Sequence, residues 1–414
     1  MKLNKYIIFA IIYFFLNSLG LPIGLTYTAL LCPFFYWWVL VSRKQEILLP
    51  FFLCLLPFIT LQVLMGTGLD MNSYITSLFN LTAVYIFCQA FYTFLKKCRD
   101  IEGIFRKLMI LNFILCLIAI PLYFTSYYDI LWIEQFLTQG IAAFRRLKLF
   151  TYEASYYATL FVPLLFFYFL KLVTGRNRSN TWIMLAMLLL PLALSFSLGV
   201  LSAILMAVLI AFLIHGSTIV RKRRGLKFIA WITLASVIGL AVMVIFFPGN
   251  ALFLRLTNIL GGNDQSGKGR TTDSFVLAGK ILDRGNHWWG IGPGQIKIVG
   301  AEIIRRYYGY QPLYMVITIP NAVAETWAVF GFIGLLLRFA IEISLFFYTR
   351  VWSNYYRLLL FIFIFIYQFT GSFITNLAEY VIWILAFTEV FPQFNVIRRT
   401  PTQQQIQQIP KSAK

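Results

Sequence analysis

Five arginines are the residues of this sequence best suited to bind an anionic group. Arg145 and Arg146 are adjacent, Arg305 and Arg306 are adjacent, and Arg270 stands alone between these pairs. A guanidinium group stays charged and can bind a phosphate through two parallel hydrogen bonds. We therefore expect these side chains to bind a phosphate or diphosphate. A solvated basic face is the alternative for any one of them. Its acidic partners would be Asp264, Asp273, Asp283 and Glu302.

Three other side chains have the chemistry of a base or of a group that orients a hydroxyl. Glu325 is the first choice, because a carboxylate about one turn inside a membrane helix usually faces a cavity. It follows Asn321 by four residues, so both side chains can lie on one face of a helix. Glu153 is the second choice, although a carboxylate at a helix start also simply complements the helix dipole. His287, beside a turn, is the third.

The segment around His287 is rich in glycine and tryptophan. It reads His287-Trp288-Trp289-Gly290-Ile291-Gly292-Pro293-Gly294. Glycines this dense either let the backbone approach a ligand or form a tight turn. Trp288 could stack on a sugar, or it could belong to an aromatic belt at the membrane surface. Gln295 stands where a dinucleotide-binding motif needs its third glycine, which argues against such a motif.

The composition indicates that these residues are positioned by membrane helices. Of 414 residues, 60% are hydrophobic and only 12% are charged, which excludes a soluble enzyme, a disordered chain and a disulfide-rich mini-protein. We expect an all-α polytopic membrane protein with about twelve spans of about 20 apolar residues. The expected spans are 6–20, 23–41, 47–65, 74–95, 108–126, 155–173, 182–197, 199–219, 228–247, 320–348, 358–375 and 377–391. The pair 182–197 and 199–219 could also be one broken segment.

The distribution of cations predicts the orientation. Most Lys and Arg residues, with Arg338 among them, are assigned to cytoplasmic loops by the positive-inside rule. The net charge of +20 then reflects topology rather than a nucleic-acid partner. The chain divides into nine spans over 1–247, one large outer loop over 248–319, three spans over 320–391 and a cytoplasmic tail over 392–414. Five cysteines without a CxxC pair and only two histidines give no reason to expect a metal or cofactor.

Three motifs together resemble the bacterial O-antigen polymerase and O-antigen ligase superfamily. Glu153-Ala154-Ser155 is similar to a Glu-Pro-Ser-like motif that opens a middle span. The stretch from Arg270 to Gly294 is similar to an Arg, a short amphipathic segment and a Gly-x-Gly-x-Gly turn in a large periplasmic loop. Pro320-Asn321-Ala322-Val323-Ala324, followed by Gly331-Phe332-Ile333-Gly334, is similar to the His-Asn-x-x-Leu and Gly-Ile-x-Gly pair at the next span. The resemblance covers about residues 145–340.

The resemblance implies a GT-C-like fold in the bacterial inner membrane, with an active site facing the periplasm. It implies a polymerase that joins undecaprenyl-pyrophosphate-linked oligosaccharide units into O-antigen or a related surface polysaccharide. The acceptor hydroxyl attacks the anomeric carbon of the donor glycan, and lipid pyrophosphate leaves. Membrane lipid, a flippase and a chain-length regulator are the implied partners. No cofactor is implied.

Two alternatives remain open. Pro320 stands where ligases have a histidine, which favours a polymerase over an O-antigen ligase without excluding the ligase. A lipid-linked oligosaccharide flippase or secondary carrier is the other alternative. Carriers usually show internal repeats, broken helices and charges buried in mid-span. This sequence shows no obvious repeat and concentrates its polar residues in one outer loop, which favours an enzyme.

Overall fold

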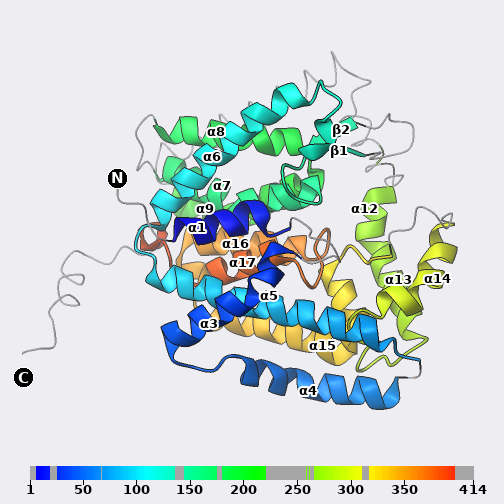
Figure 1. Cartoon of the computed structure of the whole chain (residues 1–414). Coiled ribbons are helices and arrows are strands. Elements are labelled where there is room, and N and C mark those ends of the chain that lie inside the picture. The colour runs from blue at the N-terminus through cyan, green and yellow to red at the C-terminus, as the bar shows by residue number, and fades with distance from the viewer. Residues whose placement is uncertain are drawn as a thin grey trace, which may run out of the picture.

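The computed structural model of the chain describes residues 6–18, 26–66, 68–135, 144–174, 180–220, 258, 261, 265–309 and 317–396. This part of the chain is mostly helical, with one two-stranded antiparallel sheet (Figure 1). The helices are α1 (Ile7–Ile11), α2 (Tyr27–Leu30), α3 (Cys32–Arg43), α4 (Leu48–Met65), α5 (Met71–Lys97), α6 (Ile101–Leu122), α7 (Ala154–Val173), α8 (Asn180–Ser195), α9 (Leu198–Val220), α12 (Gln265–Arg270), α13 (Thr272–Leu282), α14 (Ile296–Tyr308), α15 (Ala322–Tyr348), α16 (Tyr355–Tyr367) and α17 (Leu377–Phe387). The strands are β1 (Trp132–Gln135) and β2 (Phe144–Leu147), with Trp132 opposite Leu147.

Five helices are long and apolar enough to cross a membrane: α4, α5, α6, α7 and α15. Shorter apolar helices cover Ile7–Leu16, Thr181–Ser195, Leu198–Ile214, Tyr355–Tyr367 and Leu377–Phe387. These findings support an all-α membrane protein, while the count of twelve spans stays a prediction. The expected span at 228–247 lies outside the described residues. Helices α8 and α9 are separate, and the chain turns between them at Phe196, whose φ is 50°.

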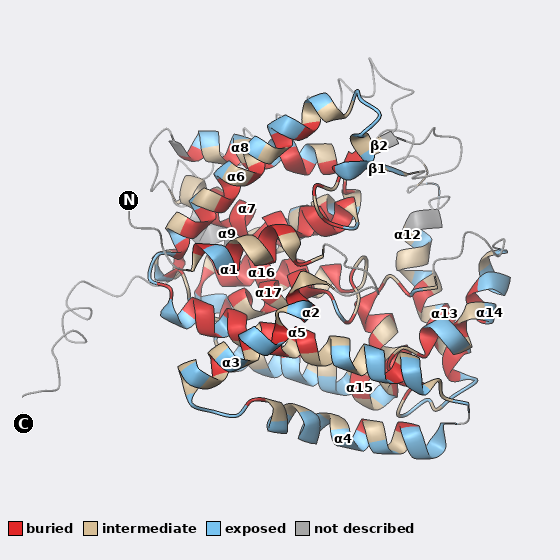
Figure 2. Ribbon diagram, viewed as in Figure 1, coloured by how far each residue is buried: buried red, intermediate tan, exposed pale blue. Residues whose placement is uncertain are grey.

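Helix α7 lies at the centre of the bundle. In its most apolar 18-residue window, 83% of the residues are buried, against 11% in α4 at the edge. A helix that is apolar on every face is stable in a protein core or in contact with lipid, and α7 is covered mainly by other helices. Helices α8, α9, α16 and α17 pack around α7, and the buried residues cluster there in Figure 2. The first residues of α7 are therefore held in a fixed position by the whole bundle.

Helix α15 is interrupted at Gly331, where φ is 66° and ψ is −166°. The interruption frees backbone groups that a regular helix would pair internally, and such groups must find other partners at membrane depth. The glycine-rich segment from His287 to Gly292 provides them. The four bonds are Ile291 N to Ala328 O (3.0 Å), Gly292 N to Val329 O (3.0 Å), Phe332 N to His287 O (2.9 Å) and Ile333 N to Trp288 O (3.1 Å).

The glycines of this segment are required by close backbone packing. A Cβ atom on Gly290 would lie 2.3 Å from the carbonyl oxygen of Val329, and one on Gly331 would lie 2.3 Å from that of Trp288. A Cβ atom on Gly294 would lie 2.3 Å from the carbonyl oxygen of Ser73 in α5. The expectation of a tight turn is confirmed, since Gly290, Gly292 and Gly294 all have positive φ, and the close approach is to the protein's own backbone.

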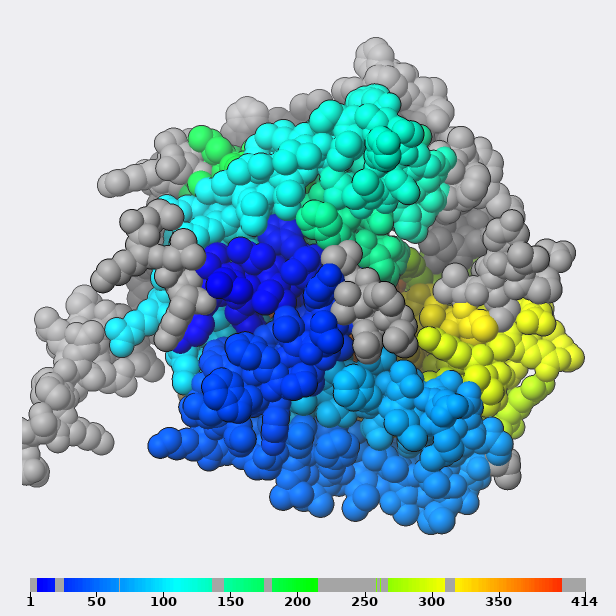
Figure 3. All heavy atoms as spheres, viewed as in Figure 1, coloured from blue at the N-terminus to red at the C-terminus, as the bar shows by residue number. Residues whose placement is uncertain are grey.

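The described part of the predicted outer loop is helical and packs onto the bundle. The short amphipathic segment between Arg270 and Gly294 forms α13, which buries Leu277, Ala278, Ile281 and Leu282. Helix α13 packs against α14 and α15. Gln295, just before α14, fixes this layer to α5 by exchanging hydrogen bonds with Asp70, and Figure 3 shows the two regions side by side.

Candidate functional site

A cavity of about 610 Å³ lies where the start of α7, the end of α12, the start of α14 and the first turn of α15 meet. The connection between α16 and α17 completes its wall. Ligand pockets typically have volumes of about 300–1,000 Å³. Among the described residues, four charged side chains line this cavity, namely Glu153, Arg270, Lys297 and Glu325. Three of the four belong to the residues that the sequence predicts for the site.

An ion pair between Arg270 and Glu153 forms one side of the cavity. One terminal guanidinium nitrogen of Arg270 lies 2.9 Å from Glu153 Oε1, and the two side chains are 30% and 23% exposed. Burial alone would raise the pKa of the Glu153 carboxyl, but the Arg270 guanidinium and local hydrogen bonds lower that pKa below its ordinary value. The pair is therefore charged, and both partners keep contact with the cavity.

Asn321 positions Arg270 from the start of α15. Its Oδ1 accepts a hydrogen bond from Ala324 N at 2.9 Å, which caps the helix. Its Nδ2 donates to the backbone oxygen of Arg270 at 2.9 Å and to that of Phe369 at 2.6 Å. Asn321 is fully buried. The sequence predicts it as a substrate-binding residue, whereas the structure places it behind the cavity wall, in contact with the backbone of Arg270.

Glu325 lines the same cavity from the first turn of α15. Its Oε2 accepts a hydrogen bond from the backbone N–H of Ile374 at 2.7 Å. Ile374 belongs to the connection between α16 and α17, so this bond holds the connection against α15. Glu325 has no salt bridge within the described residues, unlike Glu153. Its carboxylate is thus the freer of the two to accept a proton.

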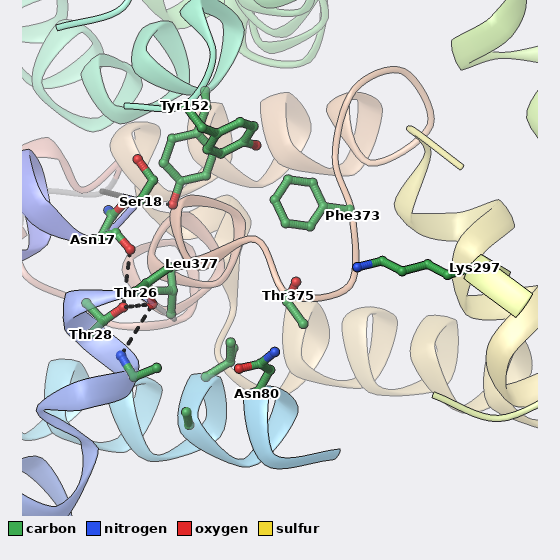
Figure 4. A pocket seen from close by; sticks show the side chains of 14 residues that line it. Asn17, Ser18, Thr26, Thr28, Asn80, Tyr152, Lys297, Phe373, Thr375 and Leu377 are labelled. Atoms are coloured by element: carbon green, nitrogen blue, oxygen red, sulfur yellow. Dashed lines mark hydrogen bonds between the residues drawn. The ribbon is translucent and has the colours of Figure 1, made fainter. Parts of the chain in front are cut away.

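Lys297 is a residue of the cavity that sequence reasoning missed. It lies in the first turn of α14, and its side chain extends toward Phe373 and Thr375 (Figure 4). A signal was available in the sequence, since Lys297 closely follows the Gly-x-Gly-x-Gly segment, for which one expectation is close approach to a ligand. Its position depends on which face of α14 turns inward, which the local sequence does not settle.

The adjacent arginines Arg145 and Arg146 have partners of their own. The Arg145 guanidinium stacks on the ring of Tyr128, 3.6 Å from its centre, and lies 3.8 Å from the Glu134 carboxylate. Arg146 is buried and donates to Ser195 O at 2.9 Å and to Gln135 Oε1 at 2.6 Å. Gln135 lines the cavity but neither arginine does. Arg146 thus contacts a residue of the cavity lining through Gln135.

Four more predicted site residues lie outside the cavity lining: Arg305, Arg306, His287 and Trp288. The buried face of α14 contains Ile296, Gly300, Ile303 and Ile304, which leaves Arg305 and Arg306 on the exposed face. Arg306 pairs there with Glu302. The expected five-arginine clamp is therefore not assembled in this structure, because amphipathic packing of α14 turns two of its members outward. Only Arg270 of the five lines the cavity.

His287 and Trp288 contribute their backbone rather than their side chains to the site region. The His287 ring is exposed and lies 3.4 Å from the Asp283 carboxylate. Trp288 is 60% exposed and packs edge-on against Phe332. The carbonyl groups of both residues accept bonds from α15 beyond its interruption. Their location fits a surface imidazole and an interfacial tryptophan.

A buried ionic cluster behind the cavity was not expected from the sequence. Arg338 pairs with Glu342, 3.1 Å away in the same helix, and with Glu379 in α17. It also donates to Gln368 at 2.9 Å and to Thr326 at 3.1 Å. Arg338, which the cation distribution assigns to the cytoplasmic side, lies within α15 and not in a loop. The signal was present, because Arg338 and Glu342 lie four residues apart within the predicted span 320–348.

The cluster is connected to the cavity through Ser372. The Ser372 hydroxyl donates to Glu379 Oε2, and Ser372 lines the cavity.

Among the described residues no group of three His, Cys, Asp or Glu side chains could hold a metal ion. No protein-family model and no curated protein matches this chain.

Proposed function

We propose that this chain is a membrane glycosyltransferase that polymerises undecaprenyl-pyrophosphate-linked oligosaccharides at the periplasmic face of the bacterial inner membrane. The observation that carries the proposal is the cavity shared by Arg270, Lys297, Glu153 and Glu325. It combines cations for a diphosphate with carboxylates for a hydroxyl group, and it lies where membrane helices begin. The product would be O-antigen or a related surface polysaccharide.

Arg270 and Lys297 are the proposed ligands of the diphosphate. Glu153 uses one terminal nitrogen of Arg270 and fixes the direction of the guanidinium group. The remaining N–H groups can bind phosphate oxygens, and charge-assisted hydrogen bonds contribute about 1.5–3 kcal/mol each. As the bond to the sugar breaks, negative charge grows on the leaving diphosphate. Cations already fixed in the cavity stabilise that charge without reorganisation.

Glu325 is the proposed base. The oxygen of the acceptor hydroxyl forms a bond to the anomeric carbon of the donor glycan, while the bond from that carbon to the diphosphate oxygen breaks. The hydroxyl proton passes to Glu325, and the lipid diphosphate leaves as an anion. Holding both glycans in one cavity converts this into an effectively intramolecular step. A flippase would supply the donor and acceptor, and a chain-length regulator would limit the product.

The experiment is complementation of a deletion strain with single variants, read as the polysaccharide ladder on a gel. Arg270→Ala should abolish long chains, and Arg270→Lys should restore little, because lysine cannot keep the same paired geometry. Arg306→Ala is the matched control, since Arg306 is exposed on α14 and pairs with Glu302. Normal ladders from both Arg270 variants, at normal protein levels, would contradict the proposal.

A carrier of lipid-linked oligosaccharide is the second candidate function. The buried Arg338–Glu342–Glu379 cluster and the interrupted helix α15 favour it, because carriers often use charges and broken helices at membrane depth. Purified protein in proteoliposomes with a fluorescent lipid-linked oligosaccharide separates the two functions. Polymer formation supports the enzyme, whereas movement of unpolymerised lipid between leaflets supports the carrier.

A further inference from the structure

A second cavity of about 500 Å³ adjoins the candidate site. It lies between the end of the first apolar helix, α2, α5, α7 and the connection between α16 and α17 (Figure 4). The two cavities share part of their walls, so a single elongated molecule can occupy both. The shared residues are Asn80, Tyr152, Lys297, Phe373 and Thr375.

The walls of this second cavity combine polar and apolar surface and are almost uncharged. Apolar side chains such as Val84 and Leu377 lie beside amides and hydroxyls from Asn17, Ser18, Thr26, Thr28, Asn80 and Thr375. These groups both donate and accept hydrogen bonds, which is what sugar hydroxyls require. Tyr152 and Phe373 add aromatic surface on which the apolar face of a sugar ring can pack. Lys297 is the one charged residue among the described residues of the lining, and it lies at the wall shared with the candidate site.

Two buried polar atoms of the lining have no hydrogen-bond partner among the described residues. They are Asn17 Nδ2 and Ser18 Oγ. Asn17 is only 2% exposed, and its two oxygens are already used by Thr28 and Tyr156, which leaves the amide N–H groups unpaired. A buried donor without a partner is costly. A ligand with oxygen acceptors would satisfy it, whereas a hydrocarbon chain would not.

We infer that this neutral cavity binds sugar residues of the glycan whose diphosphate occupies the charged cavity, an assignment that rests on the proposed function. The two cavities differ in charge, and this difference determines which end of the substrate each cavity binds. A diphosphate placed in the neutral cavity would meet one cation, while in the charged cavity it meets Arg270 and Lys297. The shared wall at Tyr152, Lys297 and Phe373 then lies at the junction between sugar and phosphate.

The probe is the repeat-unit oligosaccharide released by mild acid from the lipid-linked pool of a deletion strain, and therefore free of diphosphate. Its binding to the purified full-length protein in nanodiscs is measured by saturation-transfer NMR. Ser18→Ala removes an unpartnered hydroxyl without breaking a described hydrogen bond. Ala83→Leu fills the neutral cavity, since Ala83 lines only that one. Ala90→Leu, elsewhere on α5, controls for overcrowding of the helix.

We expect wild-type protein to bind the oligosaccharide, Ser18→Ala to weaken binding about threefold and Ala83→Leu to weaken it at least tenfold. Ala90→Leu and Arg270→Ala should leave this binding unchanged. Binding that survives both cavity variants, or that is lost with Arg270→Ala, would overturn the assignment. So would competition by undecaprenyl monophosphate alone. A deletion strain without any lipid-linked oligosaccharide would contradict the proposed function itself, whereas an accumulated glycan that fails to bind contradicts only this assignment.

Discussion

The side-chain amide of Asn321 donates a hydrogen bond to the backbone oxygen of Arg270 at 2.9 Å. The start of α15 is thereby linked directly to the residue that pairs with Glu153. Asn321 belongs to a motif that the sequence assigns to the substrate, yet its amide is fully occupied by protein backbone. It is a positioning residue, because it acts on the site through Arg270.

We expect Asn321→Ala to reduce polymer formation roughly tenfold, with an additional loss of about 1–3 kcal/mol in the free energy of unfolding from the lost cap and the unpaired backbone oxygens. Asn354→Ala is the matched control. Asn354 is also a buried asparagine that caps a helix, α16, and donates to a backbone oxygen, that of Phe391, at 2.9 Å. If the two variants lose similar stability but Asn321→Ala loses more polymer formation, the positioning role is supported. If they lose similar stability and similar polymer formation, it is contradicted.

The glycines at the interruption of α15 give a second prediction. Gly331→Ala should strongly lower the melting temperature, because the new Cβ atom would lie 2.3 Å from the Trp288 backbone and because φ is positive. Gly309→Ala is the control. Gly309 has a similar φ of 64°, but its ψ is 29° rather than −166°, and no atom lies within 4 Å of its added Cβ. Gly309→Ala should therefore lower the free energy of unfolding by the conformational strain alone, about 1–2 kcal/mol. Similar melting temperatures for the two variants would show that the backbone contact is unimportant.

Hydropathy and periodicity were sufficient to predict individual elements of the fold. The span expected at 47–65 is α4 (Leu48–Met65), and the span expected at 320–348 is α15 (Ala322–Tyr348). Both follow from local composition. Glu153, Arg270 and Glu325 are also predicted to belong to one site, from the resemblance that their motifs carry together, and all three line one cavity.

The parts that could not be predicted depend on contacts between distant segments. Arg305 and Arg306 point outward because of the face that α14 presents to α13, and Arg338 finds Glu379 in a different helix. The glycine-rich turn has the composition of a ligand-binding loop, but its partner is the broken backbone of α15. A glycine in the sequence indicates that something packs closely against its backbone. It does not indicate whether that partner is a phosphate group of a ligand or a peptide group of the protein.

The pH dependence of stability should contain a contribution from Glu153. Its pKa in the folded protein is lowered, so the ion pair stabilises the fold above the ordinary carboxyl pKa of about 4.3 and this contribution is lost as the pH falls through the lower, folded-state value. Glu153→Gln should therefore lower the melting temperature by a constant amount between pH 5 and 8. The difference from wild type should shrink below about pH 4. A difference that grows as the pH falls would contradict the ion pair.

The buried cluster gives the last prediction. Arg338→Met leaves the Glu342 and Glu379 carboxylates buried without their cation, and breaking such a pair typically costs about 3–5 kcal/mol. Arg306→Met is the matched control, since Arg306 and Glu302 have the same four-residue spacing but are exposed, and exposed pairs contribute about 0–1 kcal/mol. Unfolding in denaturing detergent measures both.

Replacing Glu342 and Glu379 by glutamine in the Arg338→Met background should recover part of the loss, because it removes the uncompensated charges rather than restoring the pair. The same variants should also affect polymer formation, because Glu379 accepts a hydrogen bond from Ser372, which lies at the wall of the cavity. A triple variant that regains stability but not polymer would place the role of the cluster in positioning Ser372. If Arg338→Met is no less stable than Arg306→Met, the guanidinium is not the partner that neutralises these carboxylates.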